Sequence, residues 1–94
     1  MAAIEWTERA LDDIHPIFDF IARDSQYYAN LFITKIYERI QSLASFPELG
    51  RVAPEMKDPS IRELIFQSYR LIYEYNGDQV RILTILHGSR IFNI

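Results

Sequence analysis

The sequence predicts an α+β fold in which a two-helix antiparallel hairpin packs on a small antiparallel β-sheet. Apolar residues recur at spacings of three and four between Leu11 and Leu43, which is the pattern of helices with one buried face. From Ile61 onward the period changes to two, as in strands. Asn76-Gly77 interrupts that second stretch and is a strong hairpin signal, because a tight turn needs positive φ. The predicted order is β-α-α-β-β-β.

The first strand is predicted at residues 3–6, where apolar and polar residues alternate. The helices separate it from the later strands, so it should pair with one from the C-terminal block. Thr7 is placed to cap the first helix. Pro16 lies inside the helical pattern, where it removes a backbone donor and crowds the preceding turn. The sequence leaves open whether Pro16 kinks one helix or splits it into two.

The second helix is predicted from about residue 26 to residue 45, with Ser25 as its cap. Tyr28 and Leu31 belong to its apolar side. Three of the four prolines lie between residues 47 and 59, so this segment is predicted to be irregular and to hold no strand.

Three strands are predicted at residues 61–66, 69–75 and 79–86. A two-residue loop at Asn76-Gly77 would place Tyr75 opposite Asp78. The face that should meet the helices carries Tyr69, Leu71, Tyr73 and Tyr75. The opposite face is half polar and half aliphatic, which suits partner binding, and carries Arg70, Ile72, Glu74, Gln79, Arg81, Leu83, Ile85 and His87.

Size and composition limit the classes of protein. The 94 residues are expected to form a single domain, residues 1–94. The composition, 49% hydrophobic and 24% charged residues, is ordinary for a globular protein. No stretch approaches the roughly 20 apolar residues that a membrane helix needs. We expect a cytoplasmic protein, because the chain has no cysteine and no secretory signal at its N-terminus.

The charge is unevenly distributed. The net charge is −3 and the pI about 5.3, so we expect no sequence-specific DNA binding by this chain alone. Residues 1–60 carry ten acids and six bases, whereas residues 61–94 carry three acids and four bases. Those four bases are all arginines, which grip carboxylates and phosphates: Arg62, Arg70, Arg81 and Arg90.

One group of residues could carry chemistry. A sharp exit of the chain at Gly88 could bring His87 and Arg90 close to Arg70. A histidine base with two cations could in principle cleave RNA. A polar sheet end without chemistry is the favoured interpretation. No metal site is expected from His15 and His87, which lie far apart, and no glycine-rich phosphate loop is present, so no cofactor is expected.

Short motifs along the chain resemble those of one known family. They are Ile4-Glu5-Trp6-Thr7, Phe46-Pro47 with Gly50-Arg51, Arg62-Glu63-Leu64, Tyr69-Arg70 with Tyr73, and His87-Gly88-x-Arg90. In this order and at this length the chain resembles the ParE/RelE superfamily of toxins from type II toxin–antitoxin systems, also called plasmid stabilisation proteins. The resemblance implies a bacterial growth inhibitor that a cognate antitoxin neutralises by wrapping it with an extended C-terminal segment.

The superfamily has two functional branches. RelE-like members cleave mRNA on the ribosome, whereas ParE-like members poison DNA gyrase by protein–protein contact. The resemblance places Arg70 and Arg90 at arginine positions of the RelE-like site and Arg62 at a lysine position. However, the second lysine, which would serve in proton transfer, aligns near Leu64, and no tyrosine follows Arg90.

These departures, with the acidic pI, favour the ParE-like branch. We therefore expect a gyrase-binding toxin that is not an enzyme, with Arg62, Arg70 and Arg90 as target contacts. The alternative is a ribosome-dependent RNase that uses Arg70, His87 and Arg90, and a third reading is an inactive toxin that only binds antitoxin. In each case the sheet edges and the groove of the helical hairpin could accept an antitoxin strand or amphipathic helix.

Overall fold

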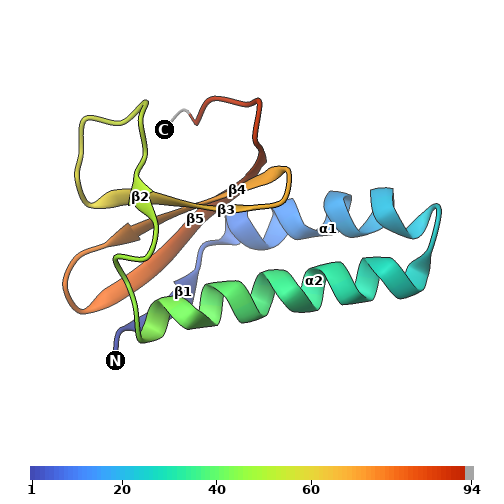
Figure 1. Cartoon of the computed structure of the whole chain (residues 1–94), viewed down its shortest axis with the longest axis horizontal. Coiled ribbons are helices and arrows are strands. Elements are labelled where there is room, and N and C mark those ends of the chain that lie inside the picture. The colour runs from blue at the N-terminus through green and yellow to red at the C-terminus, as the bar shows by residue number, and fades with distance from the viewer. Residues whose placement is uncertain (93–94) are drawn as a thin grey trace.

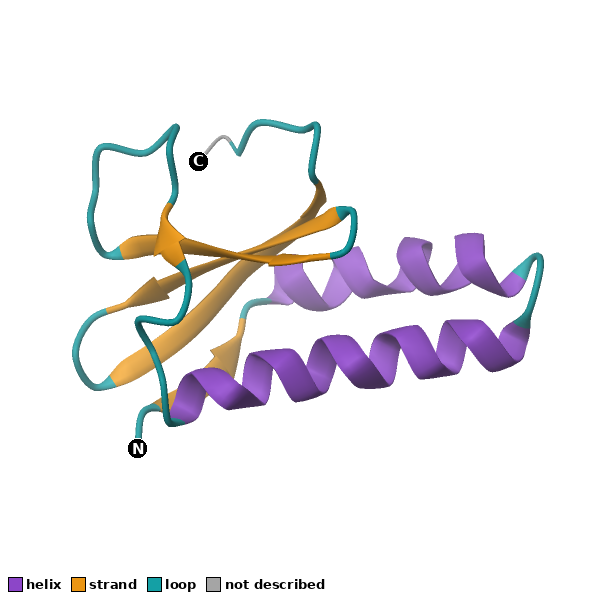
Figure 2. Cartoon of the chain, in the orientation of Figure 1, coloured by secondary structure: helices purple, strands orange, loops and turns teal. Residues whose placement is uncertain are grey.

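The computed structural model describes residues 1–92 and has two layers, a helical hairpin and a twisted sheet (Figures 1 and 2). The elements are β1 (Ala3–Trp6), α1 (Glu8–Ala22), α2 (Gln26–Gln41), a 3₁₀ turn (Ser42–Ala44), β2 (Arg51–Val52), β3 (Ile61–Phe66), β4 (Tyr69–Tyr75) and β5 (Gln79–His87). The predicted α+β hairpin-on-sheet fold is confirmed. Within residues 1–92 neither helix has the length and apolar character to span a membrane.

The sheet is mixed rather than fully antiparallel. Its strand order is β1-β5-β4-β3-β2, and β1 runs parallel to β5 while the other neighbours are antiparallel. The helical hairpin returns the chain to the end of the sheet where β1 begins, since the Ala2 N–H donates to the Ala44 carbonyl. β5 begins at that same end, and the Ala3 N–H donates to the Asp78 carbonyl. The two strands therefore start together and run in one direction.

Both helices begin at the predicted caps. The Thr7 hydroxyl accepts the Ala10 N–H at 3.1 Å, and the Ser25 hydroxyl accepts the Tyr28 N–H at 3.2 Å. The first helix continues through Pro16 without interruption, so the alternative of two shorter helices is wrong. The second helix ends at Gln41 and passes into the 3₁₀ turn.

The β4–β5 hairpin has a different register from the predicted one. Tyr75 lies opposite Val80 rather than Asp78. The Asn76 carboxamide oxygen accepts the N–H groups of Asp78 and Gln79 at 3.0 and 2.9 Å. The Asn76 N–H donates to the Gln79 carbonyl at 3.3 Å, so the two-residue loop is Gly77-Asp78, one residue later than predicted, and Gly77 in it adopts φ +100°.

A β-bulge changes which side chains of β5 face the helices. Tyr73 pairs with Ile82 and Ile72 pairs with Thr84, so Leu83 is an extra residue on β5. The extra residue inverts the alternation beyond it. Ile85 joins the core beneath the helices, and His87 follows on the same face, although the sequence placed both on the opposite side.

Each face of the sheet has its own core. The face that meets α1 and α2, here called the helix face, holds the larger one. The opposite face, here called the far face, carries a smaller cluster made of Ala53, Ile61, Ile72, Leu86 and Phe92. Residues 53–60 and the tail, residues 88–92, run on this side of the sheet (Figure 1). The prediction of an open far face is therefore wrong for Arg70 and Ile72, which are both buried.

The proline-rich segment contains a short strand. Arg51 and Val52 pair with Glu63 and Arg62 of β3, although no strand was predicted between residues 47 and 59. A two-residue strand has no alternating pattern of its own, so only its pairing with β3 defines it.

Candidate functional site

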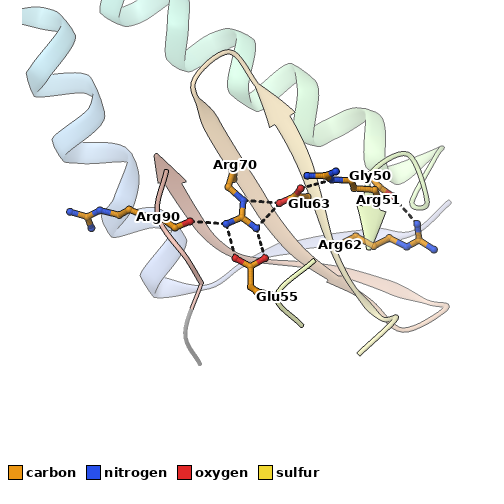
Figure 3. Close-up of polar contacts among 7 residues, drawn as sticks. All are labelled: Gly50, Arg51, Glu55, Arg62, Glu63, Arg70 and Arg90. Carbon is orange, nitrogen blue, oxygen red and sulfur yellow. Dashed lines mark hydrogen bonds and ion pairs between the residues drawn. The ribbon is translucent and has the colours of Figure 1, made fainter. Parts of the chain in front are cut away.

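Arg70 lies at the centre of a buried ion cluster on the far face (Figure 3). Its guanidinium binds the Glu55 carboxylate with two nitrogens, at 2.5 and 2.7 Å. Its Nε donates to the Glu63 carboxylate at 2.7 Å. Only 7% of Arg70 is exposed, so its planar fork is used almost entirely inside the protein.

The carboxylates of Glu55 and Glu63 neutralise the arginines of the cluster. Glu63 is 1% exposed, and its second oxygen accepts the Nε of Arg51 at 2.6 Å. The hydrogen bonds from Arg70 lower the pKa of Glu55 to about 2, and Glu55 in turn raises the pKa of Arg70. Two arginines thus offset two acids. Nothing in the sequence pattern pointed to Glu55, which lies 15 residues before its partner.

Arg90 contacts this cluster through its backbone. Its carbonyl oxygen accepts a hydrogen bond from Arg70 at 2.7 Å, while its side chain is directed away from the cluster and is exposed (Figure 3). Two residues later, the Phe92 N–H donates to the Glu55 carboxylate at 3.0 Å. The ion cluster therefore holds the tail as well as the sheet.

Arg62 precedes Glu63 on β3 but belongs to a separate group of contacts. Its guanidinium donates to the Gly50 carbonyl at 2.7 Å and lies 3.8 Å from the exposed Glu48. The Tyr73 hydroxyl accepts the Gly50 N–H at 2.9 Å and donates to the Pro47 carbonyl at 2.8 Å. Burial raises the pKa of Tyr73, so its hydroxyl keeps the proton that it donates.

His87 lies on the helix face, away from Arg70. Its ring meets the edge of Tyr69 with centroids 5.7 Å apart, and its Nδ1 is 3.0 Å from the Ser89 hydroxyl. Tyr69 and Arg70 are neighbours on β4, so their side chains point to opposite faces. The expectation that His87 and Arg90 would gather around Arg70 is wrong for His87, because the bulge in β5 turned it to the other side.

An apolar groove of about 780 Å³ lies between the tip of the helical hairpin and the β3–β4 turn. We call it the tip groove; it is lined by Phe20, Ile21, Tyr28, Leu31, Phe32, Lys35, Gln67, Ser68, Tyr69 and His87. Periodicity had placed Tyr28 and Leu31 on the buried side of the second helix, yet they are 63% and 38% exposed. The helices extend beyond the sheet, so the apolar face at their tip is left uncovered (Figure 2).

Among residues 1–92 no three histidine or acidic side chains gather closely enough to hold a metal ion. Every buried side-chain nitrogen and oxygen in the same part of the chain has a hydrogen-bond partner.

Sequence comparisons relate the chain to known toxins. Residues 4–92 match the family described as the ParE toxin of the type II toxin–antitoxin system parDE. The chain is 35% identical to Toxin RelE2 of Caulobacter vibrioides over 92 residues, covering 97% of this chain and 100% of that protein.

Two solved structures share the fold. One, from the chromosomal ParDE toxin–antitoxin system of P. aeruginosa, superposes with a TM-score of 0.76 at 22% identity, covering 93% of this chain and 96% of the other. The toxin–antitoxin complex RelBE2 of Mycobacterium tuberculosis gives 0.67 at 19% identity, covering 92% and 96%.

Proposed function

The chain belongs to the ParE toxin family of type II toxin–antitoxin systems, and we propose that it arrests bacterial growth by contacting DNA gyrase rather than by cleaving RNA. Its site of action would be the bacterial cytoplasm, with a cognate antitoxin as its inhibitor. Arg90, Arg62 and the surface around them are the proposed target contacts. Arg70 would support them from beneath.

The proposal rests mainly on Arg70, whose guanidinium is already hydrogen-bonded to other groups of the protein. RNA cleavage needs cations that are free to hold a phosphate as its charge develops. Arg70 is buried and directs its donors to Glu55, Glu63 and the backbone. A phosphate would have to displace the carboxylates of Glu55 and Glu63 from it, and Glu63, which is 1% exposed, would lose one of its two arginine partners, which is unfavourable.

The proposed absence of a nuclease site has two further supports. Leu64, near which the RelE-like lysine aligns, is 5% exposed and packs in the core under the helices. His87, the remaining candidate base, faces the tip groove on the side of the sheet opposite Arg70. A base and a cation on opposite faces of a sheet cannot act on one phosphodiester.

A supercoiling assay tests the proposal. Purified toxin is mixed with DNA gyrase and relaxed plasmid, and the products are examined for lost supercoiling and for trapped cleaved DNA. We expect both effects, and reversal when cognate antitoxin is added. Arg90→Ala should weaken the inhibition, while Arg23→Ala, which removes an exposed arginine from the end of α1, should not.

The competing function is tested with the same protein. Toxin is added to translating ribosomes and the mRNA is analysed for cuts. Cleavage that His87→Ala abolishes, together with unaffected gyrase, would overturn the proposal in favour of the RNase. Growth arrest that His87→Ala leaves intact is the expected result, because His87 is exposed and can be replaced without disturbing the fold.

For the antitoxin we propose the tip groove as the docking surface. Phe20 and Tyr28 are 65% and 63% exposed there, which is unusual for large aromatics. Lys35 lines the groove and no acidic residue does. A partner segment with apolar residues on one side and acidic residues flanking them would match both features.

A further inference from the structure

The tail crosses the far face as an anchored strap. The chain leaves β5 at His87, and the Gly88 N–H donates to the Ser68 carbonyl at 2.6 Å in the β3–β4 turn. A side chain at Gly88 would place its Cβ 3.1 Å from that carbonyl, so a glycine suits the close approach. The Arg90 N–H then donates to the His87 carbonyl at 2.9 Å, and the strap runs back over the sheet.

Two backbone groups of the strap are held by the Arg70–Glu55 ion pair, whose side chains are 8% and 18% exposed. Arg70 donates to the Arg90 carbonyl and Glu55 accepts the Phe92 N–H, while the pair itself is joined by two hydrogen bonds. Glu55 comes from the irregular segment and Arg70 from β4. The pair therefore fixes three parts of the chain relative to one another.

Phe92 adds an apolar anchor. It is 5% exposed and packs with Ile61, Ile72 and Leu86 of the far-face cluster. The guanidinium of Arg9 in α1 lies 5.2 Å from the centre of its ring. With both ends of this short segment held, the side chain of Arg90 between them is directed outward from a fixed backbone (Figure 3).

We propose that Arg70 and Glu55 are positioning residues for target binding: they clamp the strap so that the Arg90 side chain is presented in one orientation. This inference rests on the proposed function, which makes Arg90 a target contact. Arginine is a demanding contact residue, since its planar fork must meet a carboxylate or phosphate in a set geometry. A loose strap would have to be ordered during binding, and that ordering lowers affinity.

A double-mutant cycle tests the clamp. Glu55→Gln, Arg90→Ala and the double variant are compared by the toxin concentration that halves gyrase supercoiling. We expect each single change to raise this concentration roughly tenfold and the double variant to raise it by a similar factor, because both act through one contact. Glu5→Gln is the matched control, because it removes the same charge from an exposed pair with Arg81 and should have no effect.

Hydrogen exchange reports the clamp without any target. The Phe92 amide should exchange faster in Glu55→Gln than in the wild type, and at the wild-type rate in Glu5→Gln. A double variant weakened roughly a hundredfold, or a Phe92 amide whose exchange is unchanged in Glu55→Gln, would overturn the proposal. Circular dichroism sets a temperature at which every variant is folded. Phe92→Leu, which loosens the strap without removing a charge, replaces Glu55→Gln if that variant is unfolded.

The target assay also separates the two proposals. The cycle is repeated as growth inhibition on induction of the toxin, normalised to protein level, because this readout does not depend on which target is bound. If the two changes are non-additive in growth inhibition while the toxin has no effect on gyrase, the clamp is supported and the gyrase proposal is overturned. Additive effects in both assays would overturn the clamp alone.

Discussion

At Gly50 the surrounding atoms leave no room for a side chain. A Cβ at this position would lie 2.4 Å from the Glu63 carbonyl oxygen and 2.8 Å from the Tyr73 hydroxyl, and both neighbours are buried. The Gly50 backbone is held in place by Arg62 and Tyr73. The position therefore needs a glycine for contact with β3, not for its backbone angles.

We predict that Gly50→Ala destabilises the protein by about 1–3 kcal/mol, the usual cost of forcing extra volume into a packed site. Gly77→Ala offers a contrast, since its Cβ would meet nothing within 4 Å but its φ of +100° would be strained. Urea unfolding of both variants measures the two costs. An unchanged midpoint for Gly50→Ala would mean that β2 moves away from β3 without penalty.

The ionisation of Glu55 predicts how the stability of the protein depends on pH. Its pKa falls from 4.5 in the unfolded chain to about 2 in the folded protein, because Arg70 stabilises the ionised carboxylate. The stabilisation is complete above pH 4.5 and is lost as the pH falls toward 2. Glu55→Gln should cost about 2–4 kcal/mol near neutral pH, because it leaves Arg70 short of a charged partner. The difference in unfolding free energy between the wild type and Glu55→Gln should then shrink as the pH falls from 4.5 to 2.

Unfolding followed by fluorescence across this pH range checks the prediction. Glu5→Gln is again the control, and an exposed pair of this kind contributes about 0–1 kcal/mol. A gap between wild type and Glu55→Gln that stays constant down to pH 2 would show that the loss comes from packing rather than from the ion pair.

At the scale of elements, α1 protects an open sheet edge. β1 pairs with β5 only as far as Ile82, so the rest of β5 has no neighbouring strand on that side. The Thr7 hydroxyl donates to the Ile82 carbonyl at 2.7 Å, and Asp13 accepts the Ile85 N–H at 3.0 Å and the Thr84 hydroxyl. A helix side chain thus replaces the missing strand, which is one way of blocking edge-to-edge association.

We predict that Asp13→Ala destabilises the protein by about 1–3 kcal/mol, because it leaves the Thr84 hydroxyl, in a residue that is 0% exposed, without its acceptor. Asp12→Ala, one residue earlier on the exposed side of α1, should change stability by less than about 0.5 kcal/mol. Thermal unfolding compares the two, and equal losses would mean that the hydrogen bonds from Asp13 to β5 contribute nothing to stability. Light scattering should also reveal more association for Asp13→Ala.

Across the whole molecule, local signals predicted the elements but not the contacts between distant parts. Helical periodicity, the caps at Thr7 and Ser25 and the hairpin signal depend on neighbours in sequence, and they located the two helices and the β4–β5 hairpin, although not the register of that hairpin. The bulge at Leu83 has no such signal, because it arises from pairing with β4. Because the bulge was not predicted, His87 was assigned to the wrong face of the sheet.

The candidate site was predicted only in part for the same reason. The arginines could be selected from composition and from resemblance. Their partners could not, because Glu55 and Glu63 reach Arg70 only after β3, β4 and the irregular segment have come together. An arginine that the sequence offers as a free cation can therefore be the centre of a buried cluster.

The last prediction concerns the whole protein with its partner. Any antitoxin that binds only the folded toxin stabilises it, by about 2.7 kcal/mol at a hundredfold excess over its dissociation constant. For a domain of this size that corresponds to a rise in melting temperature of roughly 10–20 °C. If the docking surface is the tip groove, Phe20→Ser should greatly reduce this rise.

Phe46→Ser is a closely matched control, because Phe46 is also 65% exposed but does not line the groove. Both variants should melt close to the wild type when alone, since neither ring is buried. Calorimetry with and without antitoxin then separates the effects. Equal losses of stabilisation in the two variants would place the antitoxin elsewhere, whereas a loss confined to Phe20→Ser would identify the uncovered tip of the helical hairpin as the surface that the antitoxin covers.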